Sequence, residues 1–275
     1  MTQLVNENTK LLSNEQLGPR LYLMKLEAPV IVGKILPGQF VHMRIPGMAD
    51  HILRRPFSVY AWDVDAGTID VLYQTVGFGT DHLTTIEPDT GLGDSIELIG
   101  PIGSAWSPVV HGSDVKAGKA LIVGGGAGAP ALFMLAKQLK DAGSQVEVVL
   151  GAASKDMLVC KDRYEDMLQK PVLAATDDGS FGRAGFCTSL VEEELAKCAQ
   201  ADFAPYDYVA TCGPNPLMRI VADLAAKAGV YCEVSTERRM ACGVGACLSC
   251  VVDTTEGKKR SCVDGPIFDA KKVIW

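Results

Sequence analysis

The sequence lacks several features that would each point to a particular class of protein. It has no dense run of basic residues, and its 33 acidic residues outnumber 26 basic ones to give a net charge of −7. This balance argues against binding to nucleic acid or to an anionic membrane surface. The four histidines show no metal-site spacing, and no general acid or base motif for a carbon substrate is visible. Any chemistry on a carbon substrate is therefore expected on another protein.

Long uninterrupted hydrophobic runs are also missing. The longest, residues 120–139, is interrupted by four glycines and a proline, so it predicts a strand, a loop and a helix and not a membrane span. The first ten residues are polar and contain no apolar signal core. Together with nine cysteines, which favour a reducing compartment, these features predict a cytoplasmic protein.

The chain is long enough for two domains and a small additional module. With 275 residues, of which 48% are hydrophobic, it is expected to fold into globular units with proper cores. We expect an α+β multi-domain protein with an antiparallel β-barrel over residues 1–110, a doubly wound α/β domain over 111–233 and a cluster module over 234–275. A linker is expected at residues 111–118.

The cysteines that carry chemistry are concentrated near the C-terminus. Cys242, Cys247 and Cys250 are spaced C-x4-C-x2-C, and Cys262 follows after eleven residues. This is the plant-type 2Fe-2S pattern, whereas zinc sites usually show two C-x2-C pairs. Structural zinc and unligated or disulfide-bonded cysteines remain the alternatives. Small residues at 243–246 would let the backbone wrap closely around a cluster.

Other cysteines and the terminal tryptophan carry weaker signals. Four cysteines lie singly in apolar or helical contexts and are expected to be buried small hydrophobic residues: Cys160, Cys187, Cys198 and Cys232. Trp275, at the end of the chain, is expected to contact a partner or to serve in docking.

The first hundred residues alternate between short strands and turns. Strands are predicted at residues 21–26, 39–45, 57–62, 68–74 and 95–99. Regular strands without a long helical pattern predict a small antiparallel barrel. Within it, Arg55-Pro56-Phe57-Ser58 combines a guanidinium that can clamp a pyrophosphate with an aromatic ring and a hydroxyl that suit a flavin. Taken alone, the motif is better explained by a surface arginine pair and a core phenylalanine.

The middle of the chain alternates between strands and helices and so predicts a parallel sheet. A strand at 119–123 leads into a glycine-rich turn and a helix that ends near residue 141, an arrangement that binds phosphate at the helix N-terminus. The strict Gly-x-Gly-x-x-Gly pattern is not met. Further strands are expected at 145–150, 171–175 and 207–211, with helices at 155–168, 189–200 and 216–227. Ligands are expected at the carboxyl ends of these strands.

These two regions together resemble the ferredoxin reductase superfamily. The flavin motif here has Phe57 where many members carry tyrosine. The resemblance implies FAD contacts by Arg55, Pro56, Phe57, Ser58, Leu72, Tyr73, Gln74, Gly79 and Thr80. It implies nicotinamide nucleotide contacts by Gly124, Gly125, Gly126, Gly128, Cys212, Gly213 and Pro214. In that reading Cys212 positions the nicotinamide and is not a nucleophile. Only Lys155 follows the second strand closely, which favours NAD over NADP.

The tail identifies a narrower resemblance. Residues 237–247 and 262–268, with Cys242, Cys247, Cys250 and Cys262 as the metal ligands, closely resemble the electron-transfer subunits of class 1B dihydroorotate dehydrogenases. That resemblance implies FAD, a 2Fe-2S cluster and NAD as cofactors, and a catalytic partner that holds FMN, in a heterotetramer with two of each subunit. The alternatives are a small subunit of a related bifurcating oxidoreductase, a stand-alone reductase and a redox-sensing partner protein.

Overall fold

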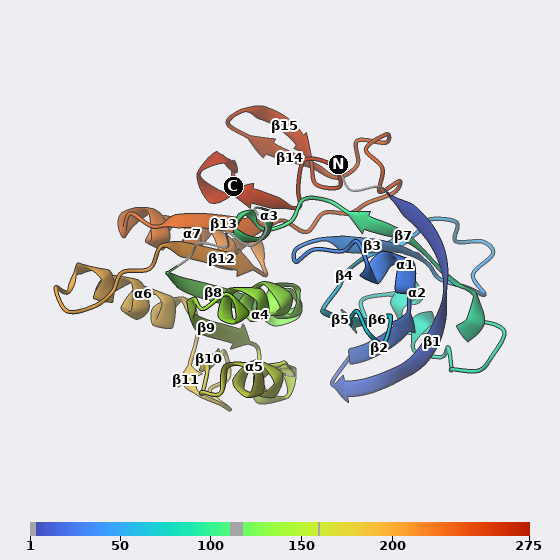
Figure 1. Cartoon of the computed structure of the whole chain (residues 1–275), viewed down its shortest axis with the longest axis horizontal. Coiled ribbons are helices and arrows are strands. Elements are labelled where there is room, and N and C mark those ends of the chain that lie inside the picture. The colour runs from blue at the N-terminus through green and yellow to red at the C-terminus, as the bar shows by residue number, and fades with distance from the viewer. Residues whose placement is uncertain (1–3, 111–117, 159) are drawn as a thin grey trace.

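The protein consists of two β-rich bodies side by side with the C-terminal segment lying across both (Figure 1). The structure is a computed structural model that describes residues 4–110, 118–158 and 160–275. The linker expected at residues 111–118 lies, except for Gly118, outside the described residues. No helix among the described residues is long and apolar enough to cross a membrane.

Seven antiparallel strands form the N-terminal barrel, in the spatial order β4-β3-β7-β1-β2-β6-β5. They are β1 (Val5–Gly18), β2 (Leu21–Glu27), β3 (Phe40–Arg44), β4 (Arg55–Ser58), β5 (Ala61–Asp63), β6 (Thr68–Gln74) and β7 (Ile96–Ile102). Three short helices accompany them: α1 (Pro29–Val32), α2 (Phe78–Leu83) and α3 (Ser107–Val110). The predicted antiparallel barrel is confirmed.

One strand prediction in the barrel was wrong, and one strand was not predicted. The single strand expected at residues 57–62 is two strands, β4 and β5, which lie at opposite ends of the strand order. Strand β1 was missed because polar residues occupy its buried positions. The Glu7 carboxylate accepts from the backbone N–H groups of Val30 and Ile31, each at 2.9 Å. The hydroxyl of Thr9 donates to the carbonyl of Ile96 at 2.8 Å. Once satisfied in this way, polar groups can be buried, but they break the hydrophobic alternation by which a strand is recognised.

The second body is a doubly wound sheet in the order β11-β10-β9-β8-β12-β13-β16. Its strands are β8 (Lys119–Gly125), β9 (Gln145–Ala152), β10 (Leu173–Thr176), β11 (Arg183–Ala184), β12 (Tyr208–Cys212), β13 (Tyr231–Ser235) and β16 (Ile267–Asp269). Helices α4 (Phe133–Asp141) and α5 (Lys161–Leu168) pack on one face, and α6 (Thr188–Ala196) and α7 (Asn215–Lys227) on the other. All neighbouring strands are parallel except the β13–β16 pair.

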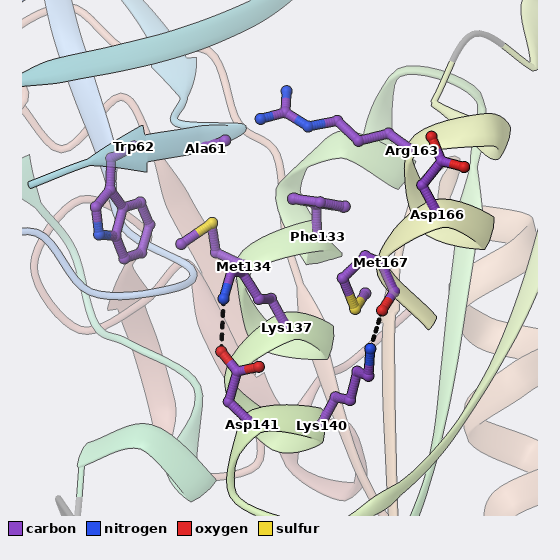
Figure 2. A pocket seen from close by; sticks show the side chains of 10 residues that line it. All are labelled: Ala61, Trp62, Phe133, Met134, Lys137, Lys140, Asp141, Arg163, Asp166 and Met167. Carbon is purple, nitrogen blue, oxygen red and sulfur yellow. Dashed lines mark hydrogen bonds and ion pairs between the residues drawn. The ribbon is translucent and has the colours of Figure 1, made fainter. Parts of the chain in front are cut away.

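The face of the sheet that carries α4 and α5 packs against the barrel. Tyr60 of the barrel contacts Phe133 with ring centroids 5.2 Å apart. Arg163 of α5 pairs with Asp70 of β6 at 3.1 Å, and Lys25 pairs with the same carboxylate at 2.7 Å. Figure 2 shows the cavity of about 490 Å³ beside this contact, between β5 and the two helices. Apolar contact and a shared, buried carboxylate therefore fix the two bodies together.

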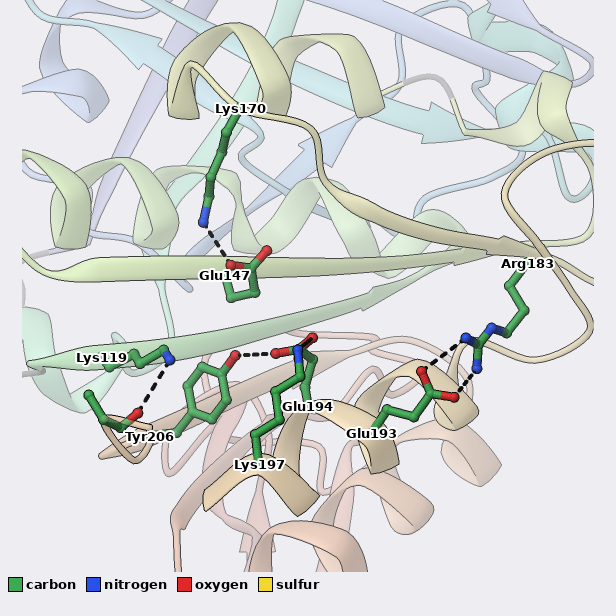
Figure 3. Close-up of polar contacts among 9 residues, drawn as sticks. Lys119, Glu147, Lys170, Arg183, Glu193, Glu194, Lys197 and Tyr206 are labelled. Atoms are coloured by element: carbon green, nitrogen blue, oxygen red, sulfur yellow. Dashed lines mark hydrogen bonds and ion pairs between the residues drawn. The ribbon is translucent and has the colours of Figure 1, made fainter. Parts of the chain in front are cut away.

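On the opposite face of the sheet, polar contacts hold α6 (Figure 3). Glu194 is buried on this helix and accepts a hydrogen bond from the hydroxyl of Tyr206 at 2.8 Å. Arg183 of β11 reaches Glu193 with both terminal nitrogens, one of them at 2.9 Å. The guanidinium of Arg183 is thus engaged by a carboxylate at the edge of the sheet.

The C-terminal segment belongs to both bodies. A hairpin of β14 (Val251–Thr254) and β15 (Gly257–Arg260) follows the cysteine loop, and the chain then adds β16 antiparallel to β13. Strand β13 itself ends at Ser235, beyond residue 234, where the third unit was predicted to begin. The hydroxyl of Ser104, at the end of the barrel, accepts a hydrogen bond from the backbone N–H of Ile267 at 3.3 Å.

Candidate redox site

Four cysteines of the C-terminal segment lie as two pairs. Cys242, Cys247 and Cys250 lie in the loop that joins β13 to β14, and Cys262 follows β15. The backbone N–H of Cys247 donates to the sulfur of Cys242 across 3.4 Å. The sulfur atoms of Cys250 and Cys262 are 3.4 Å apart. Gly243 has a φ of +68°, a conformation that glycine adopts without strain and that turns the loop between the first two cysteines.

This donor set fits a cluster of two irons. Within the described ranges, no three His, Cys, Asp or Glu side chains converge to form a site for one metal ion. A structural zinc ion takes four ligands arranged as a tetrahedron, whereas a 2Fe-2S cluster takes two cysteines on each iron. The contacts of Cys247 with Cys242 and of Cys250 with Cys262 match the second arrangement. All nine cysteines are free, so no disulfide occupies these four.

The thiols of this loop differ in how readily they ionise. Hydrogen bonding from Ser249, whose hydroxyl lies 3.3 Å from the sulfur, and then from Cys242 lowers the pKa of Cys247 to about 6. Burial and then the hydrogen bond with Cys250 raise the pKa of Cys262 to about 12. The thiolate is the form that binds metal. The exposed Cys247 therefore ionises more readily than the buried Cys262.

The cysteine loop packs on the outer face of the barrel. Cys250 and Cys262 form a small apolar cluster with Phe40 of β3 and Ile102 of β7. His42, the next outward residue of β3, is 1% exposed and lies under Gly243. Burial, and then the charge of Arg54, lowers the pKa of His42 to about 4. The sequence assigned no role to His42, because what covers it is two hundred residues away in the chain.

The two predicted pyrophosphate contacts lie next to each other. Arg55 begins β4, and its guanidinium lies over Gly79 in α2, where an added Cβ would be 3.3 Å from the arginine Nε. The hydroxyl of Thr80 accepts from the backbone N–H of Val76 at 2.8 Å and donates to the carbonyl of Gly77 at 2.9 Å. Arg55 and Gly79 are 24 positions apart in the sequence, yet they form one corner in which a cation lies beside a tight turn.

Exposed apolar side chains surround this corner. Four of them are more than half exposed: Ile52, Leu53, Val76 and Phe78. Phe57 is half-buried, with its ring 5.9 Å from that of Tyr73, and Pro56 and Ser58 lie beside it in β4. This is the environment expected of a site that a large planar ligand would cover.

The three residues predicted on β6 point to different places. Tyr73 is buried in the barrel core and donates from its hydroxyl to Asn14 at 3.0 Å. Leu72 faces the other way, into the apolar contact between barrel and α/β sheet. Gln74 is half-buried at the end of the strand. Strand alternation therefore places Tyr73 inside the barrel and its two neighbours on the opposite side.

The predicted nicotinamide residues come together at the carboxyl ends of β8 and β12. Gly124 and Gly125 end β8, and Gly126 starts the turn to α4 with a φ of +52°. An added Cβ on Gly128 would lie only 2.5 Å from the backbone nitrogen of Gly213. The turn thus packs directly on Cys212-Gly213, and Pro214 caps α7.

Cys212 is fully buried at this junction. Burial, and then the nearby carboxylate of Glu237, raises the pKa of its thiol well above the ordinary value. A buried thiol that keeps its proton is a poor nucleophile. Beyond it, Trp275, Arg219 and Arg238 help to line a cavity of about 410 Å³ beside the start of α7.

The chain is similar to a set of proteins that share one name. Residues 237–274 match the iron-sulfur cluster binding domain of dihydroorotate dehydrogenase B. An electron transfer subunit of dihydroorotate dehydrogenase B (NAD(+)) from Desulforamulus reducens is 35% identical over 272 residues, 98% of each chain. The protein of the same name from Enterococcus faecalis is 37% identical over 275 residues, again 98% of each.

Solved structures support the same fold. The structure of an NADH-dependent reduced ferredoxin-NADP oxidoreductase superposes with a TM-score of 0.81 at 28% identity, over 98% of this chain and 90% of that one. A ferredoxin NADP+ reductase from Neisseria gonorrhoeae has the same fold at 13% identity, with a TM-score of 0.65 over 83% of this chain and 92% of that one. On its similarity along its whole length, the chain belongs to the family of electron transfer subunits of dihydroorotate dehydrogenase B.

Proposed function

We propose that this chain is the electron-transfer subunit of an NAD+-dependent dihydroorotate dehydrogenase in pyrimidine biosynthesis. In this role it connects NAD+ with a catalytic subunit that holds FMN and oxidises dihydroorotate to orotate. The observation that carries the proposal is the pairing of the four cysteines on the face of the barrel, close to β4, the strand with the Arg55-Pro56-Phe57-Ser58 motif. The relatives that bear this name match 98% of the chain, so the match includes the barrel, the α/β domain and the C-terminal cysteine segment.

The residues of the barrel and the loop are suited to hold FAD and the cluster. When bound, FAD and NAD+ supply hydride transfer and a 2Fe-2S cluster supplies one-electron transfer. Arg55 offers a guanidinium fork to the FAD pyrophosphate, next to the tight turn at Gly79. Phe57 covers the flavin ring and Ser58 hydrogen-bonds its edge. Cys242, Cys247, Cys250 and Cys262 hold the irons.

The α/β domain is suited to hold NAD+. The turn at Gly124, Gly125, Gly126 and Gly128 brings backbone N–H groups to the nucleotide phosphates, and Cys212-Gly213-Pro214 forms the wall beside the nicotinamide. A 2′-phosphate would need a cation after β9. Arg183 at this edge of the sheet is paired with Glu193, which leaves Lys155 as the cation closest in sequence and favours NAD over NADP.

The proposed assembly contains two kinds of chain, and the present chain has three units. We assign FAD to residues 1–110, NAD to 111–233 and the cluster to 234–275. The partner is an FMN-containing dihydroorotate dehydrogenase subunit, in a heterotetramer of two of each. Nine free cysteines support a reducing compartment, the cytoplasm, as its location.

A second function is favoured by one observation. The oxidoreductase that superposes at a TM-score of 0.81 is described in the context of flavin-based electron bifurcation, so the same three units can serve another acceptor. A small subunit of such an enzyme would accept electrons from NADH without any response to dihydroorotate.

Purification of the native complex tests the proposal. The tagged chain is isolated from its host, and iron, sulfide, FAD and FMN are quantified together with dihydroorotate-dependent reduction of NAD+. We expect a second chain, FMN and NAD+ reduction that stops when the partner is removed. Dihydroorotate-independent turnover with ferredoxin would support the bifurcating function, and zinc in place of iron would contradict both.

A further inference from the structure

His42 lies between strand β4 and the loop that carries Cys242. It stands on β3 directly across from Pro56 of the Arg55-Pro56-Phe57-Ser58 motif. On its other side is Gly243, on which an added Cβ would lie 2.6 Å from the imidazole Nδ1. The side chain is 1% exposed, so the ring is enclosed between the barrel and the loop that carries Cys242.

Within the part of the chain that the structure describes, the buried ring nitrogens Nδ1 and Nε2 of the imidazole make no hydrogen bond of normal geometry. Weaker contacts with the backbone of Arg54 and of Cys242 raise the pKa of the ring, but burial outweighs them. An imidazole carries at least one N–H whatever its protonation state, and a buried donor without an acceptor is unfavourable. The charged side chains that act on the ring, Arg54 and Arg55, are hydrogen-bond donors only and cannot accept a hydrogen bond from its N–H.

A cluster held by the adjacent Cys242 would offer this N–H a further acceptor. We propose that the N–H of His42 donates a hydrogen bond to the sulfur side of the cluster at Cys242 and so raises the reduction potential of the cluster. This inference rests on the proposed function, because it requires a 2Fe-2S cluster in the loop. A donor to cluster sulfur stabilises the reduced form, since reduction adds negative charge there.

The proposal also gives the histidine a reason to be buried at this position. Its neighbour on the same face of β3, Phe40, packs apolar surface against Cys250 and Cys262. His42 lies over the other end of the loop, where the first cysteine pair is located. One pair is thus covered by apolar atoms and the other by a donor, so the two irons would have different surroundings.

Three proteins test this in the complete complex: the parent protein, His42→Leu and His42→Asn. Leucine removes the donor at similar volume. Asparagine keeps an N–H close to the position of Nδ1. The measurements are iron and sulfide per FAD, and the midpoint potentials of cluster and flavin from a redox titration followed by electron paramagnetic resonance and visible absorbance.

We expect His42→Leu to lower the ratio of reduced to oxidised cluster at fixed potential about tenfold, which for one electron is ~59 mV. The flavin potential should stay unchanged, and His42→Asn should restore most of the shift. Loss of the cluster from the leucine variant alone would support the donor role in the same way.

Two results would overturn the inference. If the cluster potential is the same in all three proteins, or if leucine and asparagine lower it or lose the cluster equally, His42 acts only through packing. If the parent protein itself holds no iron and sulfide, the proposed function fails as well. The parent measurement therefore separates the two failures.

Discussion

Replacing Gly243 by alanine tests whether the cysteine loop needs its close contact with the barrel. At a φ of +68°, an L-residue costs about 1–2 kcal/mol. The added Cβ would also lie 2.6 Å from Nδ1 of His42, a ring that is 1% exposed and has no free space to move into. Such overpacking costs about 1–3 kcal/mol more. We therefore expect Gly243→Ala to displace the loop and to lose most of the bound cluster.

Gly229 provides the matched control for this prediction. Its φ is +72°, nearly that of Gly243, yet nothing lies within 4 Å of an added Cβ. Gly229→Ala thus carries the backbone cost without the steric one. The assay is iron and acid-labile sulfide per FAD, followed by the temperature at which the cluster absorbance disappears. Equal cluster content and equal thermal loss in the two variants would refute the steric argument.

Four further outcomes are expected. Arg55→Ala should weaken FAD by about 1.5–3 kcal/mol through loss of a charged hydrogen bond, measured by flavin titration of the apoprotein; unchanged affinity would remove Arg55 from the site. Cys247→Ser should abolish the cluster absorbance but leave FAD bound, and loss of FAD as well would contradict separate sites. Gly128→Ala, whose Cβ would lie 2.5 Å from the nitrogen of Gly213, should raise the KM for NADH. Gly126→Ala, at a φ of +52°, carries only a backbone cost, since no atom lies within 4 Å of its added Cβ, and should raise the KM less. In the cluster-free protein, alkylation of Cys247 should rise with pH to half its maximum near pH 6, because the thiolate is the reactive form, and a midpoint near 9 would contradict the pKa.

Short sequence patterns predicted the features that depend on residues close together in the chain. The spacing of Cys242, Cys247 and Cys250 predicted a loop that gathers sulfur atoms, and the structure pairs them. The alternation of strands and helices predicted a parallel sheet, and the structure packs its glycine-rich turn at Gly128 on Gly213. Strands with hydrophobic alternation, such as residues 68–74, were predicted to the residue.

The sequence could not predict features that depend on distant partners. Strand β1 is hidden because Glu7 and Thr9 are buried polar residues whose partners lie in α1 and β7. Position alone marked Tyr73 as a flavin contact, whereas the strand turns its side chain into the barrel core. The importance of His42 depends on Gly243, and only the folded chain brings these two residues together.

The strand β16 has a practical consequence for anyone who wishes to study the flavin chemistry without the cluster. Cutting the chain after β13 would leave that strand as a bare sheet edge, open to pairing with another molecule. It would also uncover Phe40 and Ile102 on the barrel. A truncated protein is therefore a candidate for aggregation, and its behaviour would reflect that damage. A cluster-free form is better obtained by point substitution of the cysteines, which keeps the tail as a structural part of both bodies.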